Sequence, residues 1–420
     1  MVKRKWSIAL MRHRLFLWHR SLTCERAFVL LCASIAALLM LMTVSTAPEV
    51  VTKLLFGYDQ SKSPLLASVL DDEKLRFKIL QIPDMHYTGD PNYPCRDPPY
   101  KYLKKNIACT ESKMTEFIAH LLDSERPDFV VFTGDQIESV EIQHTKEEVI
   151  QAMNAATKEV IERKIPWSMV FGNHDEGRTM SKSEMFDFLD ELPYSYSKFG
   201  PREIGGVGNY QLHVEAPING PWYTMKRRST KPLLRFYFMD SHNGLFTPNQ
   251  IEFATELSAT TFHEHIPALM FFHNPIPEYK LYDQMPVPPD GRLPHGKRLE
   301  KVSHGDYNSG MFDAMKQMND VKAAFVGHDH FNDYCFYLDP LHLCYGGGVG
   351  YGGAYGYQHT QRRARIIEWN WNRREEVIET WLHEDPNTEG IRTQKYEIYR
   401  ETHEQYPAKK LRSIKHNKLH

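Results

Sequence analysis

Cysteine is scarce in this sequence, at 6 of 420 residues, and no Cys-x-x-Cys pair indicates a zinc site. An excess of charge of one sign is also missing. The formal net charge is only −2, which argues against a nucleic-acid-binding protein, because such proteins usually carry a basic surface. We find no internal repeat, and no Asn-x-Ser/Thr sequon in the body of the chain. The 41% hydrophobic and 25% charged residues are ordinary for a globular protein with a large core and one or two domains.

Charged residues are absent from one stretch near the N-terminus, residues 27–48. Residues 1–26 before it are rich in Lys and Arg, and Glu49 follows it. About 20 apolar residues span a bilayer as a helix, and flanking basic residues keep their side in the cytosol. We therefore expect a cytoplasmic tail at 1–26 and a transmembrane signal anchor at 27–48, as in a single-pass type II membrane protein. The alternative is a cleaved signal peptide and a secreted protein. In both cases the rest of the chain lies in the lumen of the secretory pathway or outside the cell.

The chain after the anchor divides into a stem, a body and a tail. Residues 49–74 have no sustained periodicity and are expected to form the stem. Residues 75–386 carry the regular patterns of a folded domain. Residues 387–420 are polar, end basic, and are expected to be poorly ordered.

Four of the cysteines lie in the body, while Cys24 and Cys32 lie at or within the expected anchor. An even number of cysteines in an oxidising compartment suggests disulfides, and three connectivities are possible. We favour the local pairing because each bond then closes a short loop beside a polar motif. The two bonds would join Cys95 to Cys109 and Cys335 to Cys344.

Apolar runs typical of buried strands alternate with amphipathic helical patterns in the body, which predicts right-handed βαβ units and an α/β fold. Residues 279–306 are rich in proline and lack periodicity, and a loop of this length is usually functional or mobile. The glycine- and tyrosine-rich residues 346–356 are expected to form a tight loop near a site. The main expected strands are 76–83, 128–133, 167–171, 268–272 and 323–326, and the main expected helices are 112–124, 145–163, 181–191, 247–263 and 308–318.

Each of these five strands ends in a short polar motif. Open α/β sheets place their ligands at the carboxyl ends of strands, so five such motifs indicate one site built from distant parts of the chain. A single His in one of them would more often be a hydrogen-bonded core residue, but the set as a whole is not explained in this way. The motifs are Asp84-Met85-His86, Gly134-Asp135, Gly172-Asn173-His174-Asp175, His273 and Gly327-His328-Asp329-His330.

The candidate ligands offer oxygen and nitrogen atoms and no thiolate, which suits Fe, Mn or Zn. Two side chains of Asp84-Met85-His86 converge only if the strand curls into a loop there, with Met85 pointing into the core. Seven donors exceed one tetrahedral shell, so two metal ions that share a bridging carboxylate fit the number better. The seven candidates are Asp84, His86, Asp135, Asn173, His273, His328 and His330.

Over residues 75–385 this ordered set of motifs resembles the calcineurin-like metallophosphoesterase superfamily. In their detailed sequence the motifs resemble the purple-acid-phosphatase-related branch of that superfamily. Further stretches that carry the resemblance are Phe132-Thr133 before Gly134, Gly206-Val207-Gly208-Asn209-Tyr210, and Asn274-Pro275 after His273. The resemblance implies a four-layer αββα sandwich of two mixed β-sheets flanked by helices. It also implies a dinuclear phosphoesterase, most often a phosphatase acting on a phosphorylated small molecule or phosphoprotein.

The resemblance also implies a role for each position. One metal would be held by Asp84, His86, Asp135 and His330, and the other by Asp135, Asn173, His273 and His328, with Asp135 as the bridge. A hydroxide between the metals would attack phosphorus in line. His174 would help the leaving group depart, and Asp175 would orient His174.

Glu138 departs from the purple acid phosphatases, which carry a Tyr ligand three residues after the bridging Asp. Without that phenolate we expect a colourless centre with two divalent metals or a mixed pair. Two other functions stay open: a phosphodiesterase or nuclease of the same superfamily, and a catalytically inactive, membrane-tethered binding protein. The intact ligands and His174 argue against the latter.

Overall fold

A computed structural model of the chain describes residues 62–71, 74–217, 232–261, 264–284, 294–357, 360–372, 374–386 and 392–403. The expected cytoplasmic tail and signal anchor lie outside these ranges. Among the helices within them, none is long and apolar enough to cross a membrane. The chain divides into two units between Ser63 and Pro64, and the description below concerns the second unit.

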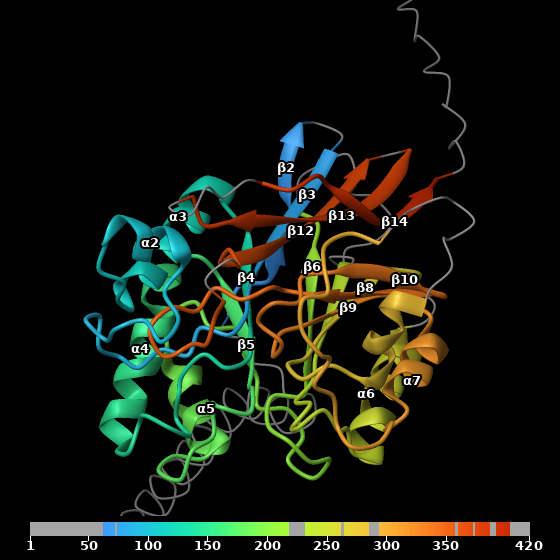
Figure 1. Cartoon of the computed structure of the whole chain (residues 1–420). Coiled ribbons are helices and arrows are strands. Elements are labelled where there is room, and N and C mark those ends of the chain that lie inside the picture. The colour runs from blue at the N-terminus through green and yellow to red at the C-terminus, as the bar shows by residue number, and fades with distance from the viewer. Residues whose placement is uncertain are drawn as a thin grey trace, which may run out of the picture. The chain divides into compact units, whose positions relative to one another are not determined.

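Two mixed β-sheets form the centre of this unit (Figure 1). The first sheet has the strand order β1-β6-β7-β8-β9-β11-β10, with parallel pairing from β7 through β8 and β9 to β11. Its strands are β1 (Leu65–Leu66), β6 (Tyr210–Glu215), β7 (Pro232–Phe238), β8 (Ala268–Phe271), β9 (Val321–Val326), β10 (Cys335–Leu338) and β11 (Leu341–Tyr345).

The second sheet has the order β14-β13-β12-β3-β4-β5, and β2 pairs with β3. β3, β4 and β5 are parallel, whereas β12 joins β3 antiparallel. Its strands are β2 (Ser68–Asp71), β3 (Lys74–Ile82), β4 (Phe129–Thr133), β5 (Trp167–Val170), β12 (Arg363–Asn372), β13 (Glu375–Glu384) and β14 (Tyr396–Thr402).

Helices cover the outer face of each sheet, so the unit has four layers (Figure 1). Buried side chains of α3, α4 and α5 form one core with the second sheet, and those of α6 and α7 form another with the first sheet. A third core, rich in phenylalanine, fills the space between the sheets. The helices are α2 (Tyr100–Lys105), α3 (Ser112–Glu125), α4 (Lys146–Glu162), α5 (Lys182–Glu191), α6 (Pro248–Thr261), α7 (Met311–Met318) and the 3-10 helix η2 (Pro277–Gln284). The expected αββα sandwich is confirmed.

The folded region is longer at both ends than the expected body, residues 75–386. β1 and β2 lie in the expected stem, where they pair with β6 and β3. β14 lies in the expected tail and pairs with β13. Tyr396 and Ile398 are both buried, so the period-two alternation of this strand was a signal that the sequence interpretation overlooked.

Covalent and polar links hold the layers in place near the strand ends. The local disulfides, Cys95–Cys109 and Cys335–Cys344, are both present, so this prediction is confirmed. The buried guanidinium of Arg365, on β12, donates to the carbonyl oxygens of Tyr345 and Asp333, both at 2.6 Å. Because Tyr345 belongs to the other sheet, Arg365 ties the two sheets together beside the loop that follows β9.

Candidate metal centre

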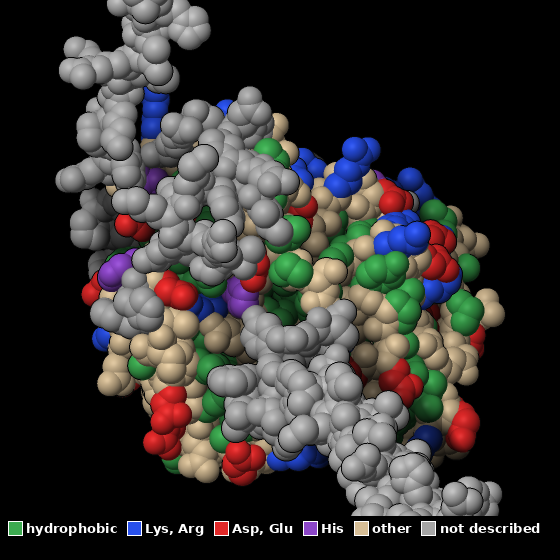
Figure 2. Space-filling model, turned by 180° about the vertical axis from the view of Figure 1, so that it is seen from behind, with side chains coloured by type: hydrophobic (Ala, Val, Ile, Leu, Met, Phe, Trp, Pro, Cys, Tyr) green, Lys and Arg blue, Asp and Glu red, His purple; other side chains and the backbone are tan. Residues whose placement is uncertain are grey.

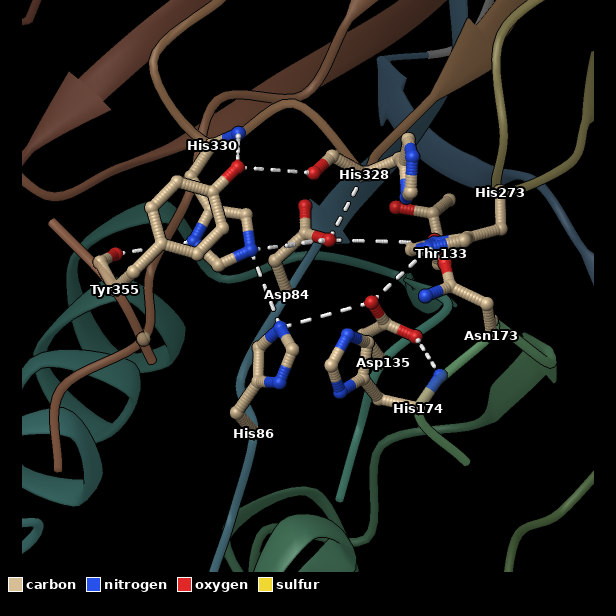
Figure 3. A network of polar contacts seen from close by, with 12 residues as sticks. Asp84, His86, Thr133, Asp135, Asn173, His174, His273, His328, His330 and Tyr355 are labelled. Carbon is tan, nitrogen blue, oxygen red and sulfur yellow. Dashed lines mark hydrogen bonds and ion pairs between the residues drawn. The ribbon is translucent and has the colours of Figure 1, made fainter. Parts of the chain in front are cut away.

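The carboxyl ends of five strands meet at one edge of the two sheets, and all seven candidate ligands lie there (Figure 3). The parallel strands β3, β4 and β5 contribute from one sheet, and β8 and β9 contribute from the other. Asp84 and His86 follow β3, Asp135 follows β4, Asn173 follows β5, His273 follows β8, and His328 and His330 follow β9. The edge therefore gathers donors that are up to 246 residues apart in the sequence, from Asp84 to His330.

The backbone curls at the ligands, as the sequence predicted for Asp84-Met85-His86. Four of the ligands have positive φ values, in the left-handed region that residues other than glycine seldom adopt. The values are 52° for Asp84, 48° for His86, 51° for Asp135 and 75° for His328. Met85 points into the core and is fully buried. The curl directs the side chains of Asp84 and His86 toward the metal centre while Met85 between them points away.

Glycines next to the ligands allow the strand ends to approach closely. A Cβ atom on Gly134 would lie 2.1 Å from Nδ1 of His273, and one on Gly172 would lie 2.0 Å from Oδ1 of Asp135. Both distances are far too short for non-bonded atoms, which essentially never approach a Cβ atom more closely than 3.0 Å. The Gly residues of these two motifs are thus required by the packing of the ligands themselves.

Within the described residues, three groups of side chains have ligand atoms close enough to share a cation: Asp84, His86 and His330; Asp135, His273 and His328; and His86, Glu138 and His174. The first two groups consist of predicted ligands, and Asp84, His86 and His330 form the first of these. Nε2 of His330 lies 3.7 Å from Oδ1 of Asp84 and 3.1 Å from Nε2 of His86. Nδ1 of His330 lies 3.1 Å from the carbonyl oxygen of Tyr355, which fixes that nitrogen as the donor. The lone pair of Nε2 is then free to bind a metal ion.

Asp135, His273 and His328 form the second group. Nδ1 of His273 donates to the carbonyl oxygen of Thr133 at 2.8 Å, so its Nε2 faces Oδ2 of Asp135 at 3.1 Å. Oδ1 of Asn173 lies 3.2 Å from the same Nε2, which adds a neutral oxygen donor to this group.

Asp135 lies between the two groups. Its Oδ2 is 3.1 Å from Nε2 of His273 and 3.6 Å from Nε2 of His86, so one oxygen faces a ligand of each group. Its Oδ1 accepts the backbone N–H of His174 at 2.8 Å. This is the geometry that a bridging carboxylate needs.

The residues present fit a pair of cations. Within the described part of the chain, Oδ2 of Asp84 and Nδ1 of His328 are buried without a hydrogen-bond partner, and such atoms are costly unless something else binds them. Burial lowers the pKa of His273, but the charge of Asp135 outweighs it and raises that pKa to about 9. Burial and the charge of His273 lower the pKa of His328 to about 3. Burial also raises the pKa of Asp84 well above its usual value, so a bound cation would stabilise the charged form of this carboxylate. Fe, Mn or Zn ions suit these oxygen and nitrogen ligands.

Glu138 is a residue of the site whose contacts the sequence did not reveal. Its buried carboxylate lies 2.6 Å from Nδ1 of His86 through Oε2 and 2.6 Å from Nδ1 of His174 through Oε1. Burial raises the pKa of Glu138, but hydrogen bonds with both rings outweigh it and lower the pKa to about 2. Burial lowers the pKa of His174, but its bond to Glu138 and the charge of Asp135 raise it to about 9.

Asp175 was expected to orient His174, and this prediction was wrong. Its fully buried carboxylate instead accepts backbone N–H groups of the loops that carry the ligands. These bonds come from Asp135 at 2.9 Å, Gln136 at 2.8 Å, Ile137 at 3.1 Å and Gly172 at 2.6 Å. Asp175 therefore fixes the backbone around Asp135, and Glu138 takes the role that we had given to Asp175.

The glycine- and tyrosine-rich loop lies at the site, as expected. The ring of Tyr355 stacks on that of His330, with centroids 3.7 Å apart (Figure 3). The hydroxyl of Tyr355 donates to Oε2 of Glu300 at 3.3 Å, and Oε1 of Glu300 accepts the N–H of Phe331 at 2.6 Å. The second half of the proline-rich segment is thus fixed to the loop that carries His328 and His330.

Two mixed sheets between helices, with two groups of metal ligands at the strand ends, define a dinuclear metallohydrolase architecture. The chain belongs to the calcineurin-like phosphoesterase family, whose model matches residues 77–332. Metal-dependent phosphoester hydrolysis is therefore the chemistry of the family.

The chain is similar in sequence to proteins of a plant and a yeast. The chain is 31% identical over 336 residues to "Probable inactive purple acid phosphatase 29" of Arabidopsis thaliana, covering 73% of this chain and 81% of the relative. It is 33% identical over 320 residues to "Probable inactive purple acid phosphatase 28" of the same plant, covering 70% and 75%. It is 33% identical over 336 residues to "Phosphatase DCR2" of Saccharomyces cerevisiae, covering 73% of this chain and 53% of the relative.

Proposed function

We propose that this protein is a dinuclear-metal-dependent phosphomonoesterase. The observation that carries the proposal is the partial exposure of His174 next to the buried candidate ligands. The side chain of His174 is 29% exposed, whereas the side chains of Asp84, Asp135 and His273 are 2% exposed or less. A phosphoryl group that approaches from the side of His174 would contact both the His174 ring and metal ions bound by the candidate ligands.

The residues then have distinct tasks. Bound metal ions would supply an activated water and positive charge for the phosphoryl oxygens. Asp135, Asp84, Asn173 and the four ligand histidines would hold those ions. His174, with Nδ1 bound to Glu138, presents its Nε2 to the substrate, where a proton can pass to the leaving oxygen.

The near-zero net charge of the chain favours a small or lightly charged substrate over a nucleic acid. On the face in Figure 2, Lys and Arg side chains are interspersed with Asp and Glu. The net charge of −2 agrees with this distribution. A polyanion usually requires a basic stripe or groove, so we place the phosphodiesterase or nuclease function second.

An inactive binding protein is the alternative from another class. The word "inactive" in the names of two Arabidopsis relatives supports it, while the name of the yeast relative supports activity. All seven candidate ligands and His174 lie together in this chain, and a fold kept only for binding has no need of this set. We therefore favour the enzyme.

The test is an assay of the full-length protein, purified with chelator and reloaded with Mn²⁺, Zn²⁺ or Fe²⁺, on 4-nitrophenyl phosphate and bis(4-nitrophenyl) phosphate. We expect metal-dependent hydrolysis of the monoester, at a kcat of about 1 s⁻¹ or more, and slow turnover of the diester. The variant Asp187→Asn, changed at an exposed position of α5, is the matched control and should behave like the wild type. Preferred turnover of the diester would select the phosphodiesterase. Two bound metals without turnover of either ester would select the binding protein.

We further propose that residues 27–48 anchor the protein in a membrane of the secretory pathway, with the metal centre on the side away from the cytosol. The two disulfides support this proposal, because such bonds persist in oxidising compartments. Alkaline extraction of membranes should leave the protein in the pellet, and external protease on sealed microsomes should spare residues 64–403. Release by alkali would favour secretion after signal cleavage, and digestion of these residues would reverse the orientation.

A further inference from the structure

Asn274 is a buried polar residue next to the second metal group, and it is not one of the seven candidate ligands. It directly follows His273, and only 3% of its surface is exposed. Nδ2 of Asn274 donates to Oδ1 of Asn173 at 3.4 Å. That same oxygen lies 3.2 Å from Nε2 of His273, and the two side chains lie side by side in Figure 3. Asn274 therefore contacts the oxygen that Asn173 offers to the second metal position.

The backbone of Asn274 is held in place by its neighbours. Its N–H donates at 2.9 Å to the hydroxyl of Ser241, which is fully buried in the loop after β7. The carbonyl oxygen of His273 accepts the N–H of Gly327 at 3.1 Å, and the ring of Pro275 restricts the backbone on the other side. The carboxamide of Asn274 thus reaches Asn173 from a fixed support.

A carboxamide is an unfavourable group at this buried position. Oδ1 of Asn274 has no hydrogen-bond partner within the described residues, and burial of such an oxygen destabilises a fold. A leucine side chain has a similar size and would carry no unpaired polar atom. The polar side chain of Asn274 therefore indicates a task in the metal centre, and its contact with Asn173 indicates which ligand the task concerns.

We propose that Asn274 is a positioning residue that selects which edge of the Asn173 amide faces the second metal ion. The inference rests on the metal centre of the proposed function, and not on the ester that is hydrolysed. Asn274 would act through Asn173 and would bind neither a metal ion nor the substrate.

The chemistry of the amide explains why its orientation must be selected. An asparagine side chain has two edges of nearly the same shape, an oxygen that accepts and an NH2 group that donates. Only the oxygen binds a cation, so a half-turn of the Asn173 amide would remove one ligand from the second group. The N–H of Asn274 attracts the oxygen edge and repels the NH2 edge. Because the oxygen has two lone pairs, one can accept from Asn274 while the other binds the metal ion.

The test compares one substitution in two backgrounds. Asn274→Leu removes the donor and keeps a similar volume. Asn173→Asp replaces the amide by a carboxylate, which has an oxygen at both edges and needs no selection of orientation. In the Asn173→Asp background, loss of the Asn274 donor should therefore leave metal binding unchanged, whereas a general packing defect would persist. Asn154→Leu, at an exposed position of α4, is the matched control.

Zn²⁺ affinity is measured on the full-length protein in detergent micelles, by competition with a chelator. We expect Asn274→Leu to weaken the binding of one of two Zn²⁺ ions by about 10–100-fold and to leave the other at its wild-type affinity. In the Asn173→Asp background the same substitution should change neither affinity by more than about twofold. Asn154→Leu should reproduce the wild type.

The contact itself is followed by NMR spectroscopy of protein labelled with ¹⁵N at asparagine. The side-chain NH2 signals of Asn274 are assigned by their loss in Asn274→Leu. We expect them to shift as Zn²⁺ binds to the wild type, because a cation on Oδ1 of Asn173 changes the acceptor that these hydrogens face. This measurement needs no folded variant at Asn173.

Each result decides for or against the role of Asn274 without turnover. Unchanged Zn²⁺ affinity in Asn274→Leu overturns the proposal, and so does an equal loss in both backgrounds, which would make Asn274 a packing residue. A wild-type protein that binds two Zn²⁺ ions without a shift of the Asn274 signals overturns it as well. If the wild type shows the expected shifts and affinities but hydrolyses neither ester, the proposed function fails and the role of Asn274 stands.

Discussion

Replacing Asp135 with asparagine is expected to lower kcat/KM for a phosphomonoester by about 10³-fold or more and to reduce the bound metal from two ions to one or none. Oδ2 of Asp135 faces a histidine of each group, so loss of its negative charge weakens both positions at once. The shape of the side chain is kept, and the effect would therefore be electrostatic. Metal content by atomic emission and steady-state kinetics on the same sample would measure it.

The matched control is again Asp187→Asn on α5, which makes the same chemical change at an exposed position. It should keep two metals and wild-type kinetics. If Asp135→Asn also kept two metals and full activity, Asp135 could not be the bridge, and the division of the ligands into two groups would have to be abandoned.

Replacing His174 with alanine is expected to give the second-largest loss, about 10²–10⁴-fold in kcat for an alkyl phosphate. An alkoxide needs a proton as it departs, whereas 4-nitrophenolate does not, so the loss should be much smaller for 4-nitrophenyl phosphate. Metal content should stay at the wild-type value, because His174 is not among the candidate ligands. The measurement is kcat for both substrates with the metal content of each sample.

His144→Ala, at an exposed position, is the control for removal of an imidazole. Equal losses of kcat for the two phosphates would contradict the role of His174 as a proton donor. A parallel loss of metal would make His174 a ligand instead.

The sequence predicted the ligands well because the chemistry of the site is local. Each motif follows a strand whose apolar run is easy to recognise, and parallel neighbours must end at the same edge of a sheet. Asp84, Asp135 and His273 could therefore be placed together before any distance was known. Each group takes ligands from both sheets, because the loops after β3 and β4 of one sheet meet the loops after β8 and β9 of the other.

The supporting residues could not be predicted in this way. Glu138 contacts His86 across 52 residues, and Glu300 meets Tyr355 across 55, with no motif to link either pair. Asp175 misled the interpretation because it is adjacent to His174 in sequence. Consecutive residues in a tight turn point in different directions, and the carboxylate of Asp175 turned to the backbone N–H groups of Asp135 and its neighbours. Side-chain direction in loops depends on tertiary hydrogen bonds, which a sequence pattern does not contain.

The left-handed backbone of Asp84, His86, Asp135 and His328 has a consequence for the stability of the fold. Such a conformation costs roughly 1 kcal/mol or more for each residue with a side chain, so the four together cost on the order of 4 kcal/mol. This is a large share of the roughly 5–15 kcal/mol that keeps a domain folded. A chain that needed only the scaffold would gain stability by mutating any of these positions to glycine. The four side chains at these positions therefore lower the stability of the empty fold, and bound cations would restore part of it.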